Sequence, residues 1–156
     1  MKLSTKQGDE GFTELAGKKV PKDSLVIEVM GQLDECSALL VWCYTRTNDP
    51  FFKLENQNLT AAMSLLAGYD TGINWKEKAE ELELLATTHF TGFAYPYENE
   101  TLAIINYTRT RVRTAERRAV TLSAQNPEIR TLLPWLNRLS DALFVKTLCA
   151  KKENVK

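Results

Sequence analysis

The segment from Glu100 to Ser123 carries the strongest helical period of the chain and most constrains its fold. One heptad seam runs through Leu102, Ile105, Arg109, Val112, Glu116 and Ala119. Spacings of three and four predict a long helix with one face turned to a core. Two seam positions, Arg109 and Glu116, are charged, and Arg113 lies between them on the same side. Buried charges without partners are costly, so we expect counter-charges or a ligand beside them.

The rest of the chain predicts about four more helices. The first has a cap at Asp23 or Ser24, and its apolar face consists of Val26, Val29, Leu33, Cys36, Leu40 and Cys43. Gly31 interrupts it, which a close helix contact or a ligand would explain. A second helix spans about 54–66 and a third spans 75–85, with Asn74 as its cap. The last runs to about 151, with Pro134 in its first turn.

No strand alternation is visible, so the sequence predicts a single all-α domain, a helical bundle. Residues 1–22 are expected to form an irregular loop, 23–151 the bundle and 152–156 a frayed tail. The 156 residues suit one domain. Lys plus Arg and Asp plus Glu number 20 each, which gives no electrostatic reason to expect a nucleic acid or a membrane as partner.

Cysteine and histidine usage limits the chemistry. Cys36, Cys43 and Cys149 are odd in number and lack CxxC spacing, which favours buried, reduced thiols of a cytoplasmic protein. The first residues show no secretory signal, and apolar runs are too short to cross a bilayer. His89 is the only histidine, which disfavours a histidine triad or a multi-histidine metal site. We predict no metal site built from protein ligands.

Two interpretations of the polar seam stay open from the residues alone. An inter-helix ion-pair network would fix register, whereas a functional site would use the same arginines to bind a ligand. Asp34, next to the apolar face of the first helix, is a candidate ion-pair partner for Arg109. Asn137 and Asp141 share a face of the last helix. The N-terminal loop adds a lysine, glycines and hydroxyls, groups that can hold phosphate and hydrated magnesium.

Four segments in order resemble the trimeric ATP:cob(I)alamin adenosyltransferases. They are TKQGDEGFT at 5–13, GQLDEC at 31–36, TRTRVRTAER at 108–117 and NRLSDALF at 137–144. The resemblance implies a ferritin-like, up-down five-helix bundle that forms a homotrimer with active sites between subunits. It also implies transfer of the 5′-deoxyadenosyl group of ATP to cobalt(I) of a corrinoid such as cobalamin, with ATP bound as its Mg²⁺ complex and triphosphate released.

The resemblance also implies roles for individual residues. Asp34 would pair with Arg109 across the subunit interface, and Phe93 would close the lower face of the corrin. The expected catalytic residues are Asp34, Phe93, Arg109 and Arg113. The expected ATP-binding residues are Thr5, Lys6, Gly8, Asp9, Gly11, Thr13, Lys22, Arg113, Glu116 and Asn137.

Several residues depart from the family pattern. Tyr97 and Glu98 follow Pro96 where the family has Pro-Gly-Gly, Asn106 replaces a common histidine, and Thr114 replaces an arginine. Val26 stands where a basic residue is frequent. These departures leave an alternative open, a weak or inactive homologue that binds ATP or corrinoid as a regulatory or delivery module. A plain structural bundle is a third reading, which leaves the Lys6 loop unexplained.

Overall fold

The computed structural model describes residues 8–87, 92, 95–97 and 99–149. A short hairpin, β1 (Phe12–Leu15) and β2 (Lys18–Pro21), precedes the helices. The α-helices are α1 (Leu25–Thr47), α2 (Pro50–Leu66), α3 (Trp75–Leu85), α4 (Glu100–Ser123) and α5 (Leu132–Cys149). A 3₁₀ turn, η1 (Pro127–Thr131), leads into α5. The prediction of five helices in a bundle is therefore confirmed.

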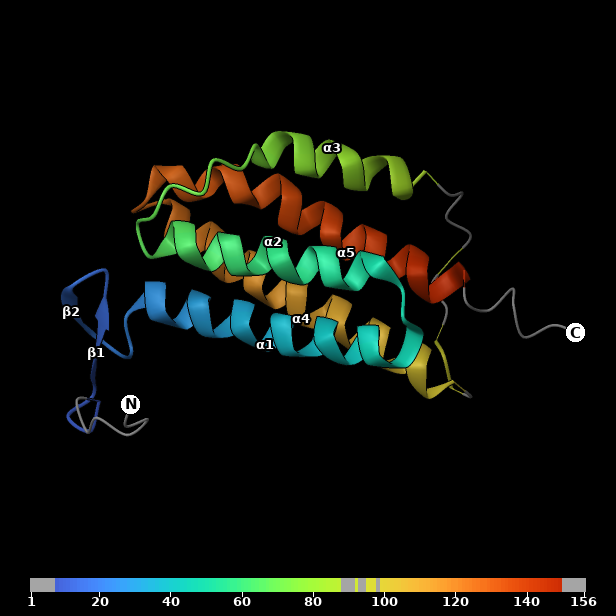
Figure 1. Cartoon of the computed structure of the whole chain (residues 1–156), viewed down its shortest axis with the longest axis horizontal. Helices are drawn as coiled ribbons and strands as arrows, with labels where there is room; N and C mark the ends of the chain where they lie inside the picture. The colour runs from blue at the N-terminus through green and yellow to red at the C-terminus, as the bar shows by residue number, and fades with distance from the viewer. Residues whose placement is uncertain (1–7, 88–91, 93–94, 98, 150–156) are drawn as a thin grey trace, which may run out of the picture.

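The helices lie side by side along the long axis of the molecule (Figure 1). α1 packs on α2 and α4, α4 packs on α5, and α5 packs on α3. The core between them is apolar, and Trp135 in the first turn of α5 is fully buried beside Trp75, with 4.9 Å between ring centroids. None of the helices in the described ranges is long and apolar enough to pass through a bilayer.

Residues 12–21 form a β-hairpin, so the prediction of an irregular loop was wrong for this part of the N-terminal segment. β1 and β2 pair antiparallel, with Phe12 opposite Pro21 and Leu15 opposite Lys18. The turn between them places Ala16 at φ 47° and Gly17 at φ 76°. Positive φ at both central residues is typical of the type I′ hairpin turn, whose twist matches that of the strands.

The expected caps explain where the helices begin. Asn74 accepts a hydrogen bond from the backbone N–H of Glu77 and starts α3, as predicted. Ser24 is the N-cap residue of α1, although its side chain makes no capping hydrogen bond. Asp49 accepts from the N–H of Phe51, and Pro50 takes the first position of α2. α2 therefore begins four residues before the predicted start at 54.

Two cysteines of α1 lie in the core as free thiols. Cys36 and Cys43 are completely buried on the inner face of α1. Burial raises the pKa of the Cys36 thiol to about 12, so it stays protonated and unreactive at neutral pH. Cys43 lies 3.3 Å from the hydroxyl of Thr108 on α4, which fixes the level at which α1 and α4 meet.

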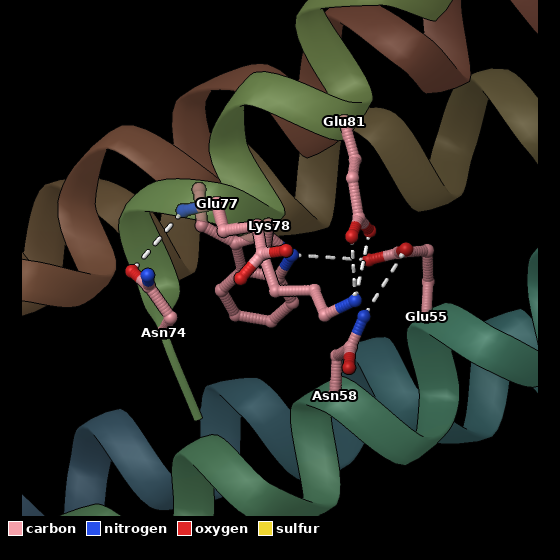
Figure 2. A network of polar contacts seen from close by, with 7 residues as sticks. Glu55, Asn58, Asn74, Glu77, Lys78 and Glu81 are labelled. Carbon is pink, nitrogen blue, oxygen red and sulfur yellow. Dashed lines mark hydrogen bonds and ion pairs between the residues drawn. The ribbon is translucent and has the colours of Figure 1, made fainter. Parts of the chain in front are cut away.

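A buried carboxyl group on α2 is hydrogen-bonded to α5 and lies near charged side chains of α3. Glu55 is only 3% exposed, and its oxygens accept hydrogen bonds from Asn58 at 3.2 Å and from the Trp135 indole at 3.0 Å. Figure 2 shows Glu55 pointing from α2 toward Lys78 and Glu81 on α3. Burial raises the pKa of Glu55, against the hydrogen bonds and the Lys78 charge, which lower it.

Candidate functional site

The glycine-containing loop before the hairpin folds around Lys22. The backbone N–H of Lys22 donates to the carbonyl of Gly11 at 2.9 Å, and Gly11 itself has φ 81°, where glycine is favoured. A Cβ added at Gly8 would lie 2.7 Å from Lys22 Nζ, so the ammonium occupies the space that a side chain would fill. The structure thus brings together three of the predicted ATP-binding residues.

The other predicted ATP-binding residues of this segment make no hydrogen bond with Lys22, or they lie outside the described residues. Asp9 is exposed at the turn, and Thr13 lies in β1 opposite Val20. Thr5 and Lys6 lie outside the described residues, as does Phe93. Their predicted roles therefore stay predictions.

A second group of predicted residues meets between α4 and α5. The Asn137 amide donates to Glu116 Oε1 at 3.0 Å. The oxygen of the same amide accepts from Arg138 Nη1 at 3.0 Å, and that nitrogen also donates to Asp141 Oδ2 at 3.1 Å. The result is a line of hydrogen bonds from a carboxylate through an amide to a guanidinium. Such charge-assisted bonds hold polar groups in one orientation.

Arg109 and Arg113 form a site with excess positive charge on α4. Arg109 is partly buried, donates from Nε to Asn106 Oδ1 at 3.0 Å, and lies 6.0 Å from the centre of the Phe144 ring. Burial, and then the Arg113 charge, lower the pKa of Arg109, while Tyr95 opposes this shift. Guanidinium keeps its proton even so. Arg113 is exposed and bonds to no group among the described residues, which leaves both cations open to an anion.

Asp34 does not meet Arg109 within one chain. It is exposed on α1 and bonds to no described side chain, whereas Arg109 bonds to Asn106. Water solvates this exposed carboxylate in the single chain, so its predicted pairing with Arg109 of another subunit stays a prediction. Gly31, three residues before Asp34, is also exposed, and a Cβ there would meet nothing within 4 Å, so no contact inside the chain accounts for this glycine.

Sequence reasoning missed the ion pairs that join α1 to α4. Arg118 pairs with Glu28 through two hydrogen bonds, and Arg111 pairs with Glu35 and with the Gln32 amide. The signal was available: the two glutamates are seven residues apart, and so are the two arginines. Equal spacing of opposite charges on two helices favours their pairing, and the observed partners, Glu28 with Arg118 and Glu35 with Arg111, show that the two helices run antiparallel.

An open cavity lies away from these residues. It has a volume of about 700 Å³ and lies where the α2–α3 connection meets η1 and the start of α5. Tyr69, Trp75 and Glu128 are among the residues that line it, and none of the predicted site residues is. The predicted site is therefore an open polar surface of this chain and not part of that cavity.

Known proteins with sequences similar to this chain are cobalamin or corrinoid adenosyltransferases. A sequence model of the family described as Cobalamin adenosyltransferase matches residues 3–150. The corrinoid adenosyltransferase of Bacillus subtilis is 32% identical over 92% of this chain and 83% of its own length. Corrinoid adenosyltransferase PduO of Citrobacter freundii is 30% identical over 92% of this chain, which spans only 48% of that protein.

Solved structures show the same fold. A variant of the PduO-type ATP:corrinoid adenosyltransferase from Lactobacillus reuteri, complexed with cobalamin and ATP, matches with a TM-score of 0.87. The match covers 97% of this chain and 94% of that one at 21% sequence identity. Identity at this level supports the fold alone, whereas the family match rests on sequence.

Proposed function

Because this chain belongs to the cobalamin adenosyltransferase family, we propose that it transfers the 5′-deoxyadenosyl group of ATP to cobalt(I) of a corrinoid. The observation that carries this function is the family match over residues 3–150. The chain is accordingly a transferase, with ATP and a reduced corrinoid as its substrates. The relative from Lactobacillus reuteri that was solved with both cobalamin and ATP supports the same pair of substrates.

The reaction balances without an added acid or base. The cobalt(I) lone pair forms a bond to the ribose 5′ carbon, the bond from that carbon to the triphosphate oxygen breaks, and triphosphate leaves with the electron pair. Negative charge therefore moves onto the leaving group. The protein accelerates such a step by holding the reactants in line and by placing cations at the phosphates.

The described residues support distinct parts of this task. Lys22, held above Gly8, supplies a cation beside backbone N–H groups that can approach phosphate oxygens. Arg109 and Arg113 add two further charges, neither of them paired with a carboxylate among the described residues. Mg²⁺ would be held mainly by the phosphates of ATP, since magnesium uses few protein ligands, and the exposed carboxylate of Asp9 could accept a metal-bound water.

The nucleotide would also contact the bonded pair Glu116 and Asn137. Each keeps hydrogen-bonding capacity beyond the bond that they share: the amide has a second N–H, and the carboxylate has further lone pairs. We assign Phe93 to the lower face of the corrin, as the resemblance implies. Displacing the axial ligand of cobalt would make the metal easier to reduce to cobalt(I).

A homotrimer is part of the proposal. The face formed by α1 and α4 exposes Trp42 at 47% and Tyr107 at 52%, at the level where Cys43 meets Thr108. Large exposed apolar groups on one face are typical of an interface. A neighbouring copy would cover them, explain the missing side chain at Gly31, and bring its Asp34 to Arg109. We place the enzyme in the cytoplasm, in keeping with its buried free thiols.

Anaerobic spectroscopy tests the function. The protein is mixed with ATP, Mg²⁺ and chemically reduced cobalamin, and the cobalt(I) absorption is followed. We expect this absorption to disappear only when protein and ATP are both present. A folded, ATP-saturated protein that leaves cobalt(I) unchanged would remove the enzymatic claim and favour the alternative of a binding or delivery module.

A further inference from the structure

Arg138 donates hydrogen bonds to the side chains of both Asn137 and Asp141 on its own helix. Consecutive residues on a helix point about 100° apart, so their side chains do not normally face each other. Arg138 nevertheless reaches back to its neighbour, and its Nη1 lies 3.0 Å from Asn137 Oδ1. The same nitrogen lies 3.1 Å from Asp141 Oδ2, a second acceptor that helps to hold the guanidinium in this position.

This contact determines which way the Asn137 amide points. The oxygen of the amide faces the guanidinium of Arg138, and its nitrogen faces the carboxylate of Glu116. Rotating the amide by half a turn would place its N–H groups against a cation and its oxygen against an anion. Both contacts would be repulsive, so the flipped state is disfavoured at both ends.

We infer that Arg138 is a positioning residue of the nucleotide site, which fixes the Asn137 amide in the orientation that binds ATP. The inference rests on the proposed function, because it assumes that Asn137 contacts the nucleotide. Glu116 fixes one end of the amide, and Arg138 fixes the other. The amide then presents its remaining N–H and its remaining lone pair to ATP in fixed directions. Because the amide is already ordered, its orientation does not reduce the free energy of binding.

The surroundings of Arg138 indicate that stability is not its main contribution. Its side chain is 37% exposed, and its ion pair with Glu83 on α3 is long, at 3.6 Å, with the Glu83 side chain 64% exposed. Ion pairs of this kind contribute little to folding. The ion pair of Arg138 with Asp141 lies on the same helix and is also partly exposed, so the bond to the Asn137 amide is the contact that bears on the site.

Calorimetric titration with ATP tests the inference without requiring turnover. Arg138→Ala should weaken ATP affinity about tenfold, the scale of one lost charge-assisted hydrogen bond, with little change in thermal midpoint. Arg138→Lys should restore part of the affinity, because its ammonium can still donate to the amide oxygen. Glu83→Gln is the control for the exposed ion pair, and Arg130→Ala is the control for loss of an exposed cation; both should bind ATP as the wild type does.

A double-mutant cycle separates positioning from independent binding. If Arg138 acts through Asn137, Arg138→Ala should have almost no further effect on ATP affinity once Asn137 is alanine. Additive losses would overturn the inference, as would wild-type affinity in Arg138→Ala. Should Arg138→Ala not fold, Arg138→Met carries the same comparison, because its side chain has no N–H donor for the amide oxygen. A wild type that binds ATP but makes no adenosylated corrinoid would remove the proposed function alone.

Discussion

Because Gly8 has no side chain, the ammonium group of Lys22 can lie against the loop at this position. A methyl group at this position would approach Lys22 Nζ to 2.7 Å, so the ammonium would have to move. A lysine side chain is flexible and moves at little cost, which means that Gly8→Ala should change the thermal midpoint only slightly. Its effect should appear in ligand binding, as an ATP affinity several-fold weaker by calorimetry, since the cation no longer lies at the loop.

A second glycine gives the matched control for this prediction. Gly17 has φ 76° in the hairpin turn, and a Cβ there would meet nothing within 4 Å. Gly17→Ala should lower stability by about 1 kcal/mol through backbone strain and leave ATP affinity nearly unchanged. If Gly8→Ala binds ATP with wild-type affinity, the position of Lys22 does not matter to the nucleotide.

Site residues that lie in a sequence motif could be predicted. Contacts that depend on side-chain conformation could not. The segment NRLSDALF drew attention to Asn137, and the charged seam drew attention to Glu116; the structure joins the two. Arg138 stands inside the same motif, yet its contact with Asn137 depends on side-chain torsions that no spacing reveals. The partner of Arg109 within the chain, Asn106, was noticed only as a departure from the family pattern.

At the scale of the helices, one buried carboxyl group makes the contact between α2 and α5 sensitive to pH. Burial raises the pKa of Glu55, so the folded state keeps this proton to a higher pH than the unfolded chain does. The free energy of unfolding therefore falls as pH rises from the unfolded carboxyl pKa of about 4.3 through the folded value.

Glu55→Gln tests this dependence because glutamine cannot ionise and its oxygen can still accept from Trp135. Thermal unfolding followed by circular dichroism between about pH 4.5 and 7.5 should show the variant gaining stability relative to the wild type as pH rises. Glu80→Gln, at an exposed position on α3, should change nothing with pH. Parallel curves for Glu55→Gln and the wild type would contradict the assignment.

Helices were easier to predict than strands for a physical reason. Each long helix carries an apolar stripe that repeats over several turns, so its existence follows from the sequence even when its first residue does not. The hairpin has only four residues in each strand and no buried face. Its turn sequence, Ala16-Gly17, also lacks the Asn-Gly or Asp-Gly signal that marks such turns.

For the whole molecule, the large apolar side chains exposed on α1 and α4 are a feature that a single chain leaves unexplained. Trp42→Glu places a charge at the centre of the proposed interface, where burial without a partner is costly. We expect a shift from trimer to monomer in light scattering coupled to size exclusion, with helical content retained. Leu84→Glu, on the exposed end of α3, is the control and should remain trimeric. A trimeric Trp42→Glu would place the interface elsewhere.

The arrangement of the helices could be predicted only in part. The number of helices followed from periodicity, and the bundle followed from their apolar faces. Which helix lies beside which did not follow, because an apolar stripe does not specify its partner. The matched spacing of Glu28 and Glu35 with Arg111 and Arg118 shows that charge patterns could have supplied one such pairing.

The products of a single anaerobic reaction test the central claim most directly. Corrinoid and phosphate products are separated by chromatography after cobalt(I) cobalamin, Mg²⁺ and ATP react on the protein. We predict adenosylcobalamin and intact triphosphate in equal amounts, because breaking the bond at the 5′ carbon releases the whole phosphate chain. Diphosphate or single phosphate in place of triphosphate, or triphosphate without adenosylated corrinoid, would contradict the account.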